Sequence, residues 1–383
     1  MTLLDYCQTD AQRRNVEAVD ELGSFSAAAK AIGIGRKTVS RSYRLVESRA
    51  AREGWVKDPE MQMDGGTVPP GFVLDKTTVH TKDGGQVQRW DRVSWSKHEA
   101  ARASQEAIEA AVEGIKPRPK VKAPATFERG LLTQYTLTDM HVGMYAWLAE
   151  TGGDWSQKEA ERVLWKAFSE MLDRSPDSEV GLLAQLGDFL HFDGLLAVTP
   201  AHHNVLDTDT RYDKLVGLVL DMTVWMIDLM LEKHKKVHVI MAEGNHDESG
   251  SSWLRQFCRK YYAKNPRVTV DASPKPYYAI LHGDILLGYH HGHKTKDAKL
   301  RDVFCSDEAF RAMWGKAKYA WIHTGHLHSS AIVETGGCIL QRHPTLSARD
   351  AYSARGGWQS WRSAEAITYH KKLGKVSSVT VVP

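Results

Sequence analysis

Polar, metal-binding residues follow five short apolar segments of this chain, and this recurrence constrains its fold more than any other feature. The five endings are Thr138-Asp139-Met140-His141, Gly187-Asp188, Gly244-Asn245-His246-Asp247, His290-His291-Gly292-His293 and Gly325-His326-Leu327-His328. In open α/β sheets the carboxyl ends of the strands meet in one crevice, so residues far apart in sequence are expected to meet there. Asp, His and Asn side chains together suit Zn, Mn or Fe(II). The recurrence therefore predicts a metal centre.

The segments belong to a wider alternation of strands and helices after residue 126. Strands are expected at 131–138, 180–186, 237–242, 277–282, 285–290, 319–324, 330–334, 339–342, 365–370 and 376–382. Helices are expected at 156–173, 208–233, 249–263 and 306–317. Early βαβα order followed by hairpins predicts a mixed α/β sandwich.

The ordered set of motifs resembles that of one enzyme superfamily. The order D-x-H, G-D, G-N-H-D, H-G and G-H-x-H, from Asp139 to His328, is similar to that of the calcineurin-like metallophosphoesterases. The resemblance implies an α/β fold of four layers, an αββα sandwich of two mixed sheets between helices. It also implies a metal-dependent phosphoesterase, a hydrolase that acts on phosphate ester bonds.

The resemblance implies a dinuclear centre with assigned ligands. Two divalent metal ions would be bridged by Asp188, with manganese expected and zinc, iron or magnesium as alternatives. The remaining ligands would be Asp139, His141 and His328 for the first ion, and Asn245, His291 and His326 for the second. His246 would be a catalytic residue that binds no metal and stabilises charge or protonates the leaving oxygen. Asp247 would hold the His246 ring in the useful tautomer.

Physical reasoning supports such a pair independently. Two cations about 3.5–4 Å apart clamp the attacking and leaving oxygens of an in-line displacement. A water shared by them is acidified towards neutrality. A bridging carboxylate offsets part of their charge, and neutral imidazoles leave the rest for the phosphate.

Several histidines keep open alternatives. His290 and His293 lie close enough to His291 to replace it as ligand or to contact phosphate. A polar loop after Asp188 offers His191 and Arg211 as substrate-binding residues together with His293, or is a solvated loop that caps the following helix. Structural roles are expected for His234, His238, His282, His323, His343 and His370.

The first 56 residues predict a separate DNA-binding unit. Helices are expected at 11–22, 24–32 and 36–53, with Ser24 or Ser26 as an N-cap and Gly33 in the tight turn. Val39, Tyr43 and Val46 repeat at helical spacing and are expected to pack inward. The opposite face would expose Arg36, Lys37, Ser40, Arg41 and Arg44, and the stretch from Arg36 to Lys57 holds seven basic and two acidic residues. The pattern resembles a helix-turn-helix unit; the alternative is a helical bundle with a solvated basic face.

Residues 57–125 connect the two parts. Asp83-Gly84 between two polar-apolar alternations predicts a β-hairpin, followed by a helix at 97–113. Alternating Pro and basic residues at 116–124 favour an extended linker. Three regions are therefore expected, the DNA-binding unit at 1–56, the connecting segment at 57–125 and the metallophosphoesterase-like domain at 126–383. The helix-turn-helix, the Pro-Pro-Gly-Phe-Val segment at 69–73 and the last domain together resemble a phage- or prophage-type branch of the superfamily.

Composition excludes several classes of protein. The most apolar stretch, Leu215 to Leu231, carries Asp221 and Asp228, which argues against a membrane span. The first residues lack the apolar core of a signal peptide, and the four cysteines show no disulfide or zinc spacing. A cytoplasmic protein is expected, in a bacterial host if the chain is phage-encoded.

These features predict a metal-dependent phosphodiesterase or nuclease that acts on nucleic acid and is tethered to DNA by its N-terminal unit. One alternative is a phosphoprotein or small-phosphoester phosphatase with a regulatory DNA-binding module. Another is a DNA-binding regulator without enzymatic activity, against which the complete ligand set argues.

Overall fold

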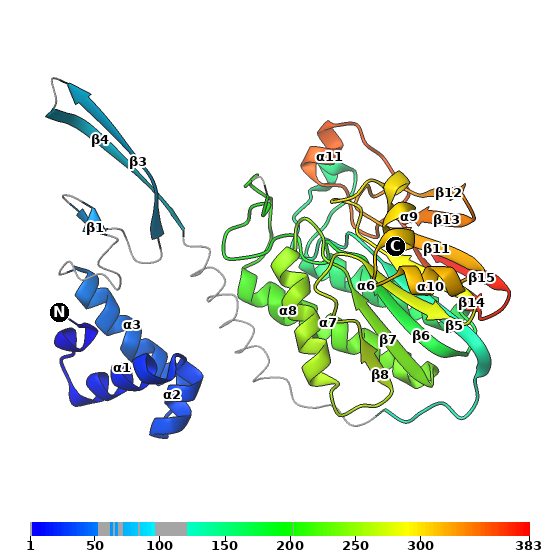
Figure 1. The fold of residues 1–383 in the computed structure, drawn as a ribbon, viewed down its shortest axis with the longest axis horizontal. Helices are drawn as coiled ribbons and strands as arrows, with labels where there is room; N and C mark the ends of the chain where they lie inside the picture. The colour runs from blue at the N-terminus through cyan, green and yellow to red at the C-terminus, as the bar shows by residue number, and fades with distance from the viewer. Residues whose placement is uncertain are drawn as a thin grey trace. The chain divides into compact units, whose positions relative to one another are not determined.

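The computed structural model describes residues 2–52, 62–63, 66–67, 72–82, 85–95, 121–201 and 203–383. The chain divides into two compact units, Met1–Ala103 and Ser104–Pro383, which are described separately (Figure 1). The helix expected at 97–113 and most of the expected linker lie outside the described residues.

The first unit begins with three packed helices. A short 3-10 helix (Leu3–Tyr6) precedes α1 (Asp10–Leu22), α2 (Phe25–Ile32) and α3 (Arg36–Arg52). Ser24 caps α2 by accepting a hydrogen bond from the Ala27 amide at 3.1 Å. Gly33 ends α2 with a φ of 72°, which glycine adopts without a steric penalty. The three helices predicted from the sequence are therefore confirmed within a residue or so of their ends.

Helix α3 has one buried and one exposed side. Val39, Tyr43 and Val46 are buried in the core that the three helices share, as their spacing predicts. The Tyr43 hydroxyl also donates to Asp20 at 2.8 Å and so ties α3 to α1. The side chains of Lys37, Arg41 and Arg44 are exposed, and those of Arg36 and Ser40 are half-buried.

The predicted hairpin is present. Strands β3 (Phe72–Lys82) and β4 (Gly85–Trp95) pair antiparallel, with Lys82 opposite Gly85. Two short strands, β1 (Gln62–Met63) and β2 (Gly66–Thr67), form a further antiparallel pair.

The second unit contains two mixed sheets. One has the order β15-β14-β5-β6-β7-β8 and the other the order β12-β13-β11-β10-β9. The first is built from β5 (Glu128–Leu137), β6 (Ser178–Gln185), β7 (Lys236–Met241), β8 (Val268–Val270), β14 (Ala364–His370) and β15 (Gly374–Val381). The second is built from β9 (Tyr278–His282), β10 (Ile285–Tyr289), β11 (Tyr319–Thr324), β12 (Ala331–Thr335) and β13 (Cys338–Arg342). Strands β5 to β8 run parallel to one another, as do β10, β11 and β13.

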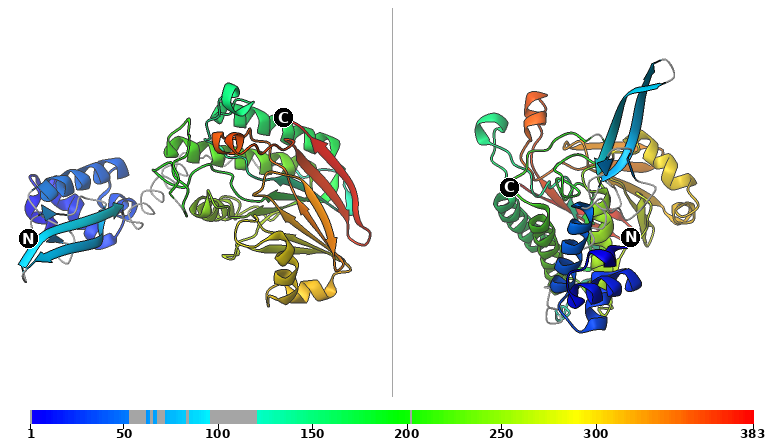
Figure 2. Two further views of the ribbon diagram at one scale, coloured as in Figure 1. Left: turned by 90° about the horizontal axis from the view of Figure 1, so that it is seen from above. Right: turned by 90° about the vertical axis from the view of Figure 1, so that its left-hand side faces the viewer.

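The sheets and helices stack in four layers (Figure 2). Leu182 and Ile240 of one sheet pack against Leu287 and Tyr289 of the other in a core between the sheets. The outer face of the six-stranded sheet is covered by α6 (Gln157–Arg174), α7 (Tyr212–Lys233) and α8 (Glu248–Tyr261). The outer face of the five-stranded sheet is covered by α9 (Asp297–Ser306) and α10 (Arg311–Lys316). The predicted αββα sandwich is therefore present in this unit.

Some elements differ from the sequence prediction. The helix expected at 306–317 is shorter, because the chain is extended at Asp307, whose carboxylate accepts the Ala309 amide at 2.9 Å, and α10 begins only at Arg311. The sequence analysis misses α9, which ends at Ser306. The sequence analysis also omits β8, α5 (Leu148–Thr151) and α11 (Ala351–Arg355). These elements are short, so they carry little periodic signal. No helix among the described residues has the length and apolar character needed to cross a membrane.

Candidate metal centre

The five motifs meet where the strands of the two sheets end. Asp139, Asp188 and Asn245 follow the parallel strands β5, β6 and β7, and His291 and His326 follow the parallel strands β10 and β11. The parallel order of the strands thus brings together residues that lie up to 187 positions apart.

A first group joins Asp139, His141 and His328. The Nε2 atoms of His141 and His328 lie 3.3 Å apart, and His328 Nε2 lies 3.2 Å from Asp139 Oδ1. These are the three residues predicted to complete the first metal site, and their ligand atoms lie within 4.8 Å of one another.

A second group joins Asp188, His291 and His326, again with ligand atoms within 4.8 Å. His291 Nε2 lies 3.2 Å from Asp188 Oδ2 and 3.1 Å from Asn245 Oδ1. This group contains the residues predicted for the second site. Among the three adjacent histidines, His291 faces the group, whereas His290 stacks on Tyr277 at 4.8 Å.

Asp188 lies between the two groups. Burial alone raises the pKa of its carboxyl group, but the positive charges available to His291, His246 and His141 outweigh burial and hold the pKa well below its usual range. Burial lowers the pKa of His291, but the carboxylates of Asp188 and Asp139 outweigh it and raise that pKa to about 9.

The backbone at these residues is unusual. Among the described residues, the non-glycine positions with positive φ are Asp139 (51°), His141 (44°), Asp188 (51°), His203 (55°), His326 (68°) and His328 (52°). All but His203 are predicted ligands. Left-handed backbone costs a non-glycine residue about 1–3 kcal/mol and persists only where the surroundings enforce it. Such strain gathers at functional sites.

One oxygen of Asp139 shows that the first group fits a cation. Its Oδ2 accepts hydrogen bonds from the His326 amide at 2.9 Å and from the Thr138 hydroxyl. Its Oδ1 is buried and accepts none within the described residues, although two imidazoles surround it. A buried carboxylate oxygen without a donor is costly, and a divalent cation would satisfy it. The possible metal-ligand atoms are carboxylate oxygens and imidazole nitrogens, which suit Mn, Zn or Fe(II).

Two glycines of the motifs, Gly244 and Gly325, leave space for neighbouring side chains. A Cβ at Gly244 would overlap both Oδ1 and the backbone nitrogen of Asp188. A Cβ at Gly325 would overlap the Thr138 hydroxyl and lie 2.7 Å from Asp139 Oδ2. The close approach of backbone to carboxylate therefore explains why glycine stands directly before Asn245 and His326.

Gly244→Ala is accordingly expected to displace Asp188 and to reduce metal binding at least tenfold, the lower range found when groups that orient a ligand are lost. The measurement is metal affinity by calorimetry, with thermal unfolding measured alongside. Gly217→Ala is the control, because that glycine lies inside α7 with open space around it. It should bind metal normally and raise stability by about 0.5–1 kcal/mol. Equal metal affinity in both variants would contradict the close packing.

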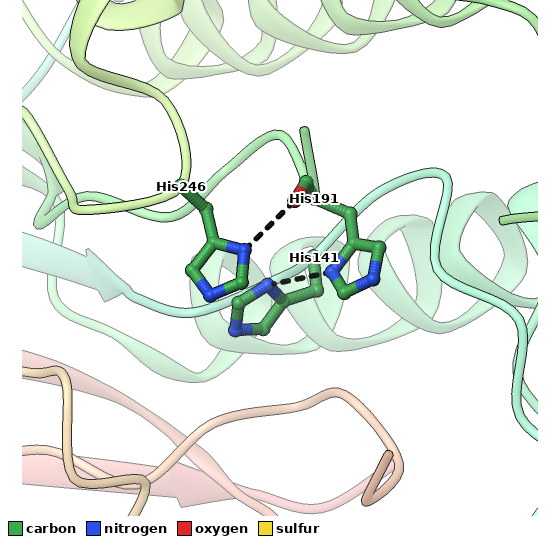
Figure 3. A group of neighbouring side chains, drawn as sticks. All are labelled: His141, His191 and His246. Carbon is green, nitrogen blue, oxygen red and sulfur yellow. Dashed lines mark hydrogen bonds between the residues drawn. The ribbon is translucent and has the colours of Figure 1, made fainter. Parts of the chain in front are cut away.

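His246, His141 and His191 form a chain of contacts beside the first group (Figure 3). His246 Nδ1 lies 2.8 Å from the His191 carbonyl oxygen, so Nδ1–H donates and Nε2 is left to carry a second proton. His191 Nδ1 lies 3.2 Å from His141 Nδ1. With Nε2 kept free as a ligand atom, His141 Nδ1 would be the donor in that contact. His191 thus fixes the tautomers of both neighbours.

This arrangement corrects one predicted role and changes another. Asp247 does not hold the His246 ring; it accepts hydrogen bonds from the backbone amides of Asp188, Phe189, Leu190 and Gly244 at 2.7–3.2 Å. Burial and the charge of Asp188 raise the pKa of Asp247 to about 6. Its carboxylate therefore shapes the loop that carries Asp188. His191, predicted to contact substrate, has a side chain that is only 2% exposed, and its ring faces His141. Burial and the charge of His246 lower the pKa of His191 to about 3.

The other predicted substrate residues lie at the edge of the centre. His293 packs beside His291, with ring centroids 5.2 Å apart, and forms a further cluster with Glu243 and Glu248. Lys294 already places its ammonium 2.6 Å from Glu243 and 3.2 Å from Glu248. Arg211 is exposed and is the N-cap residue of α7.

The histidines expected to be structural lie away from the two groups, and three of them show their partners clearly. His234 bonds to Tyr135 and Ser178, His282 bonds to the Gly130 carbonyl, and His323 bonds to His343 and Tyr369. The loop before α7 does not cap that helix through a side chain. Asp193 instead accepts two amides at the start of α8, and Asp209 accepts the Gln157 amide at the start of α6.

Thr345 and Ser347 support the centre but are absent from the sequence prediction. Both hydroxyls donate to the carbonyl oxygen of Asp139, at 2.6 and 2.9 Å. They help to hold Asp139 in its left-handed conformation. A Thr-x-Ser pair after a strand is too common to single out by sequence.

Comparison with known proteins finds similar chains only among solved structures. No family model matches this sequence, and no curated protein matches it. An archaeal phosphodiesterase aligns over 66% of this chain and 99% of its own, with 12% identity and a TM-score of 0.34. A phosphoesterase from E. coli aligns over 64% and 98%, with 14% identity and a TM-score of 0.31. A predicted phosphoesterase from Streptococcus pneumoniae aligns over 66% and 98%, with 10% identity and a TM-score of 0.27.

Proposed function

We propose that this chain is a dinuclear-metal-dependent phosphoesterase of the calcineurin-like superfamily that cleaves phosphodiesters in nucleic acid. One observation carries the proposal. Seven side chains from five separate motifs converge as two adjacent groups of possible ligands, with Asp188 between them. Five of these seven residues, Asp139, His141, Asp188, His326 and His328, are also held in left-handed backbone conformations.

The residues of the chain divide the work. Asp139, His141 and His328 would hold one cation, His291, His326 and Asn245 a second, and Asp188 both. When bound, the two cations would supply a hydroxide near neutral pH and draw charge from the phosphoryl oxygens. His246 is half-buried, with Nδ1–H fixed by the His191 carbonyl, so Nε2 is the position from which a proton would pass to the leaving oxygen.

The identity of the metal is part of the proposal. Manganese is the first candidate, because mixed carboxylate, amide and imidazole ligands suit it, with zinc, iron and magnesium as the alternatives. All four cysteines are free thiols, and none belongs to a cluster of possible ligands among the described residues. We place the protein in a reducing cytoplasm, that of a bacterial host if the chain is phage-encoded.

We further propose that the first three helices act as a helix-turn-helix unit that tethers the enzyme to DNA. What supports this is the division of α3 into a buried apolar side and an exposed side with Lys37, Arg41 and Arg44. Basic residues on an exposed helix neutralise phosphates and present side chains to a groove. A phosphatase with a separate DNA-binding module would share that helix, so activity on long DNA is the deciding measurement.

Arg41→Ala/Arg44→Ala is expected to weaken duplex binding and to flatten its salt dependence by roughly one unit of slope per lost phosphate contact. The variant should turn over a small chromogenic diester normally but process long DNA less efficiently. Arg13→Ala/Arg14→Ala on α1 removes the same charge from another exposed helix face and is the control. Equal losses of duplex affinity in the two double variants would mean that α3 contributes only its positive charge. Unchanged processing of long DNA by the α3 variant would contradict tethering.

A further inference from the structure

An exposed row of aromatic side chains lies on two short helices of the second unit. Trp147 directly precedes α5, Tyr352 lies in α11, and Trp358 and Trp361 follow α11. We call these four residues the aromatic ridge. Their exposed fractions are 58% for Trp147, 72% for Tyr352, 57% for Trp358 and 91% for Trp361. Large aromatic side chains are rarely left this open, and contiguous exposed apolar surface marks interaction sites.

The ridge is built rather than loose. The Arg349 guanidinium donates to the Thr151 carbonyl at 2.9 and 3.1 Å and to the Trp358 carbonyl at 3.3 Å. Arg355 pairs with Glu150 at 3.0 Å, so α11 is tied to α5. Tyr352 and Trp358 pack edge to face, with centroids 5.3 Å apart. Both helices lie together in Figure 1.

The same two segments are anchored on the candidate metal ligands. Thr345 and Ser347, which lead into α11, donate to the carbonyl of Asp139. Trp155, which pairs with Ala146 just before Trp147, donates its indole N–H to the carbonyl of His141 at 3.3 Å. The ridge therefore borders the centre on the side of the first ligand group.

We propose that the aromatic ridge stacks unpaired nucleobases of a strand whose phosphate enters the metal centre, so that the enzyme acts on single-stranded nucleic acid. This inference rests on the nucleic-acid substrate proposed above. The ridge residues are aromatic rather than aliphatic, and every nucleobase offers a flat face to such rings whatever its sequence. The segment 345–362 carries three arginines and one aspartate, and with Glu150, which pairs with Arg355, the surroundings of the ridge keep one net positive charge for a phosphate backbone. In a duplex the base faces are already stacked on one another, so the ridge selects unpaired ends or loops.

The test measures binding of a short homothymidine oligonucleotide, single-stranded or annealed to its complement, by fluorescence anisotropy in EDTA. The full chain carries Arg41→Ala/Arg44→Ala throughout, so that α3 contributes less. Trp358→Leu/Trp361→Leu keeps apolar bulk but removes both aromatic rings. The single variant Trp361→Phe keeps an aromatic ring at that position. Trp165→Leu, on α6, removes a half-exposed tryptophan that stacks on Trp225 and is the control.

The double leucine variant is expected to bind the single strand at least about fivefold more weakly, because each stacked base contributes a large share of affinity. Trp361→Phe alone and Trp165→Leu should bind nearly as the parent does. Turnover of a small chromogenic diester, measured with manganese, should stay unchanged in every variant.

Three results would overturn the inference. Unchanged affinity in the double leucine variant would place the strand elsewhere or make the ridge a general apolar surface for a protein segment. Equal affinity of the parent for single strand and duplex would remove the selectivity. A parent that turns over the small diester but binds no oligonucleotide would contradict the proposed role of the ridge and leave the proposed phosphoesterase activity intact. No metal-dependent diester turnover in the parent would instead remove the proposed function, and ring-dependent oligonucleotide binding would still assign the ridge.

Discussion

Asp188→Asn is expected to lower turnover by roughly 10³-fold or more, beyond the ~10²–10³ lost when a single stabilising donor is removed. Asp188 belongs to the second ligand group, and its pKa is held low by imidazoles of both groups. Asparagine keeps the shape but removes the charge that two cations would share. Metal content should therefore fall as well, which elemental analysis of the purified protein measures.

The matched control for this change is Asp350→Asn. Asp350 lies near enough to His328 to raise its pKa, and its own carboxylate caps α11 by accepting the Ser353 amide at 2.8 Å. Asparagine caps a helix as well as aspartate does, so only the nearby charge is lost. We expect metal content and turnover to stay close to normal. Two metal ions per chain with near-normal turnover in Asp188→Asn would rule out the bridge.

His246→Ala is expected to slow turnover by about 10²–10⁴-fold while leaving the metal content almost unchanged, since a positioned acid typically contributes that much. The structure leaves Nε2 of His246 without a role in holding Asp139 or Asp188. Its backbone amide, which alanine retains, donates to Asp188 at 2.8 Å. Steady-state kinetics on a series of diesters gives the measurement.

The leaving group separates two ways in which His246 could act. Nitrophenolate leaves without a proton, whereas an alkoxide does not, so proton donation predicts a much larger loss on the poorer leaving group. Equal losses across the series would mean that His246 stabilises transition-state charge instead. His282→Ala should change neither rate, because His282 pairs with Ile285 at the amino end of β10, away from the centre.

The sequence predicts the strands and the convergence of the candidate ligands because both depend on local patterns. Apolar runs such as Val237 to Ala242 form β7 within a residue or two, and the glycines before Asn245 and His326 reflect the space that the carboxylates require. A parallel sheet then brings the endings together whatever the lengths of the connections.

What the sequence misses is carried by backbone carbonyl groups. His191 orients His246 through its main-chain oxygen, and Thr345 and Ser347 hold Asp139 through a main-chain oxygen as well. Any residue type supplies a carbonyl, so these contacts leave no pattern in the letters. The expected role of Asp247 fails for a related reason. Proximity in sequence to His246 favours a contact between the side chains, whereas the carboxylate instead accepts three amides of the loop that follows β6 and the Gly244 amide of its own loop.

Two ligands of the first group, His141 and His328, lie far apart in the sequence of the second unit and follow strands of different sheets. His141 follows β5 and His328 follows β11, 187 residues later. An ion held by both residues would act as a reversible cross-link between the two sheets. By the chain-entropy reasoning used for disulfides, closing a loop of that length restricts the unfolded chain by about 5 kcal/mol. The sandwich would then gain rigidity from the same ion that equips it for chemistry, and its persistence in the cell would depend on metal supply.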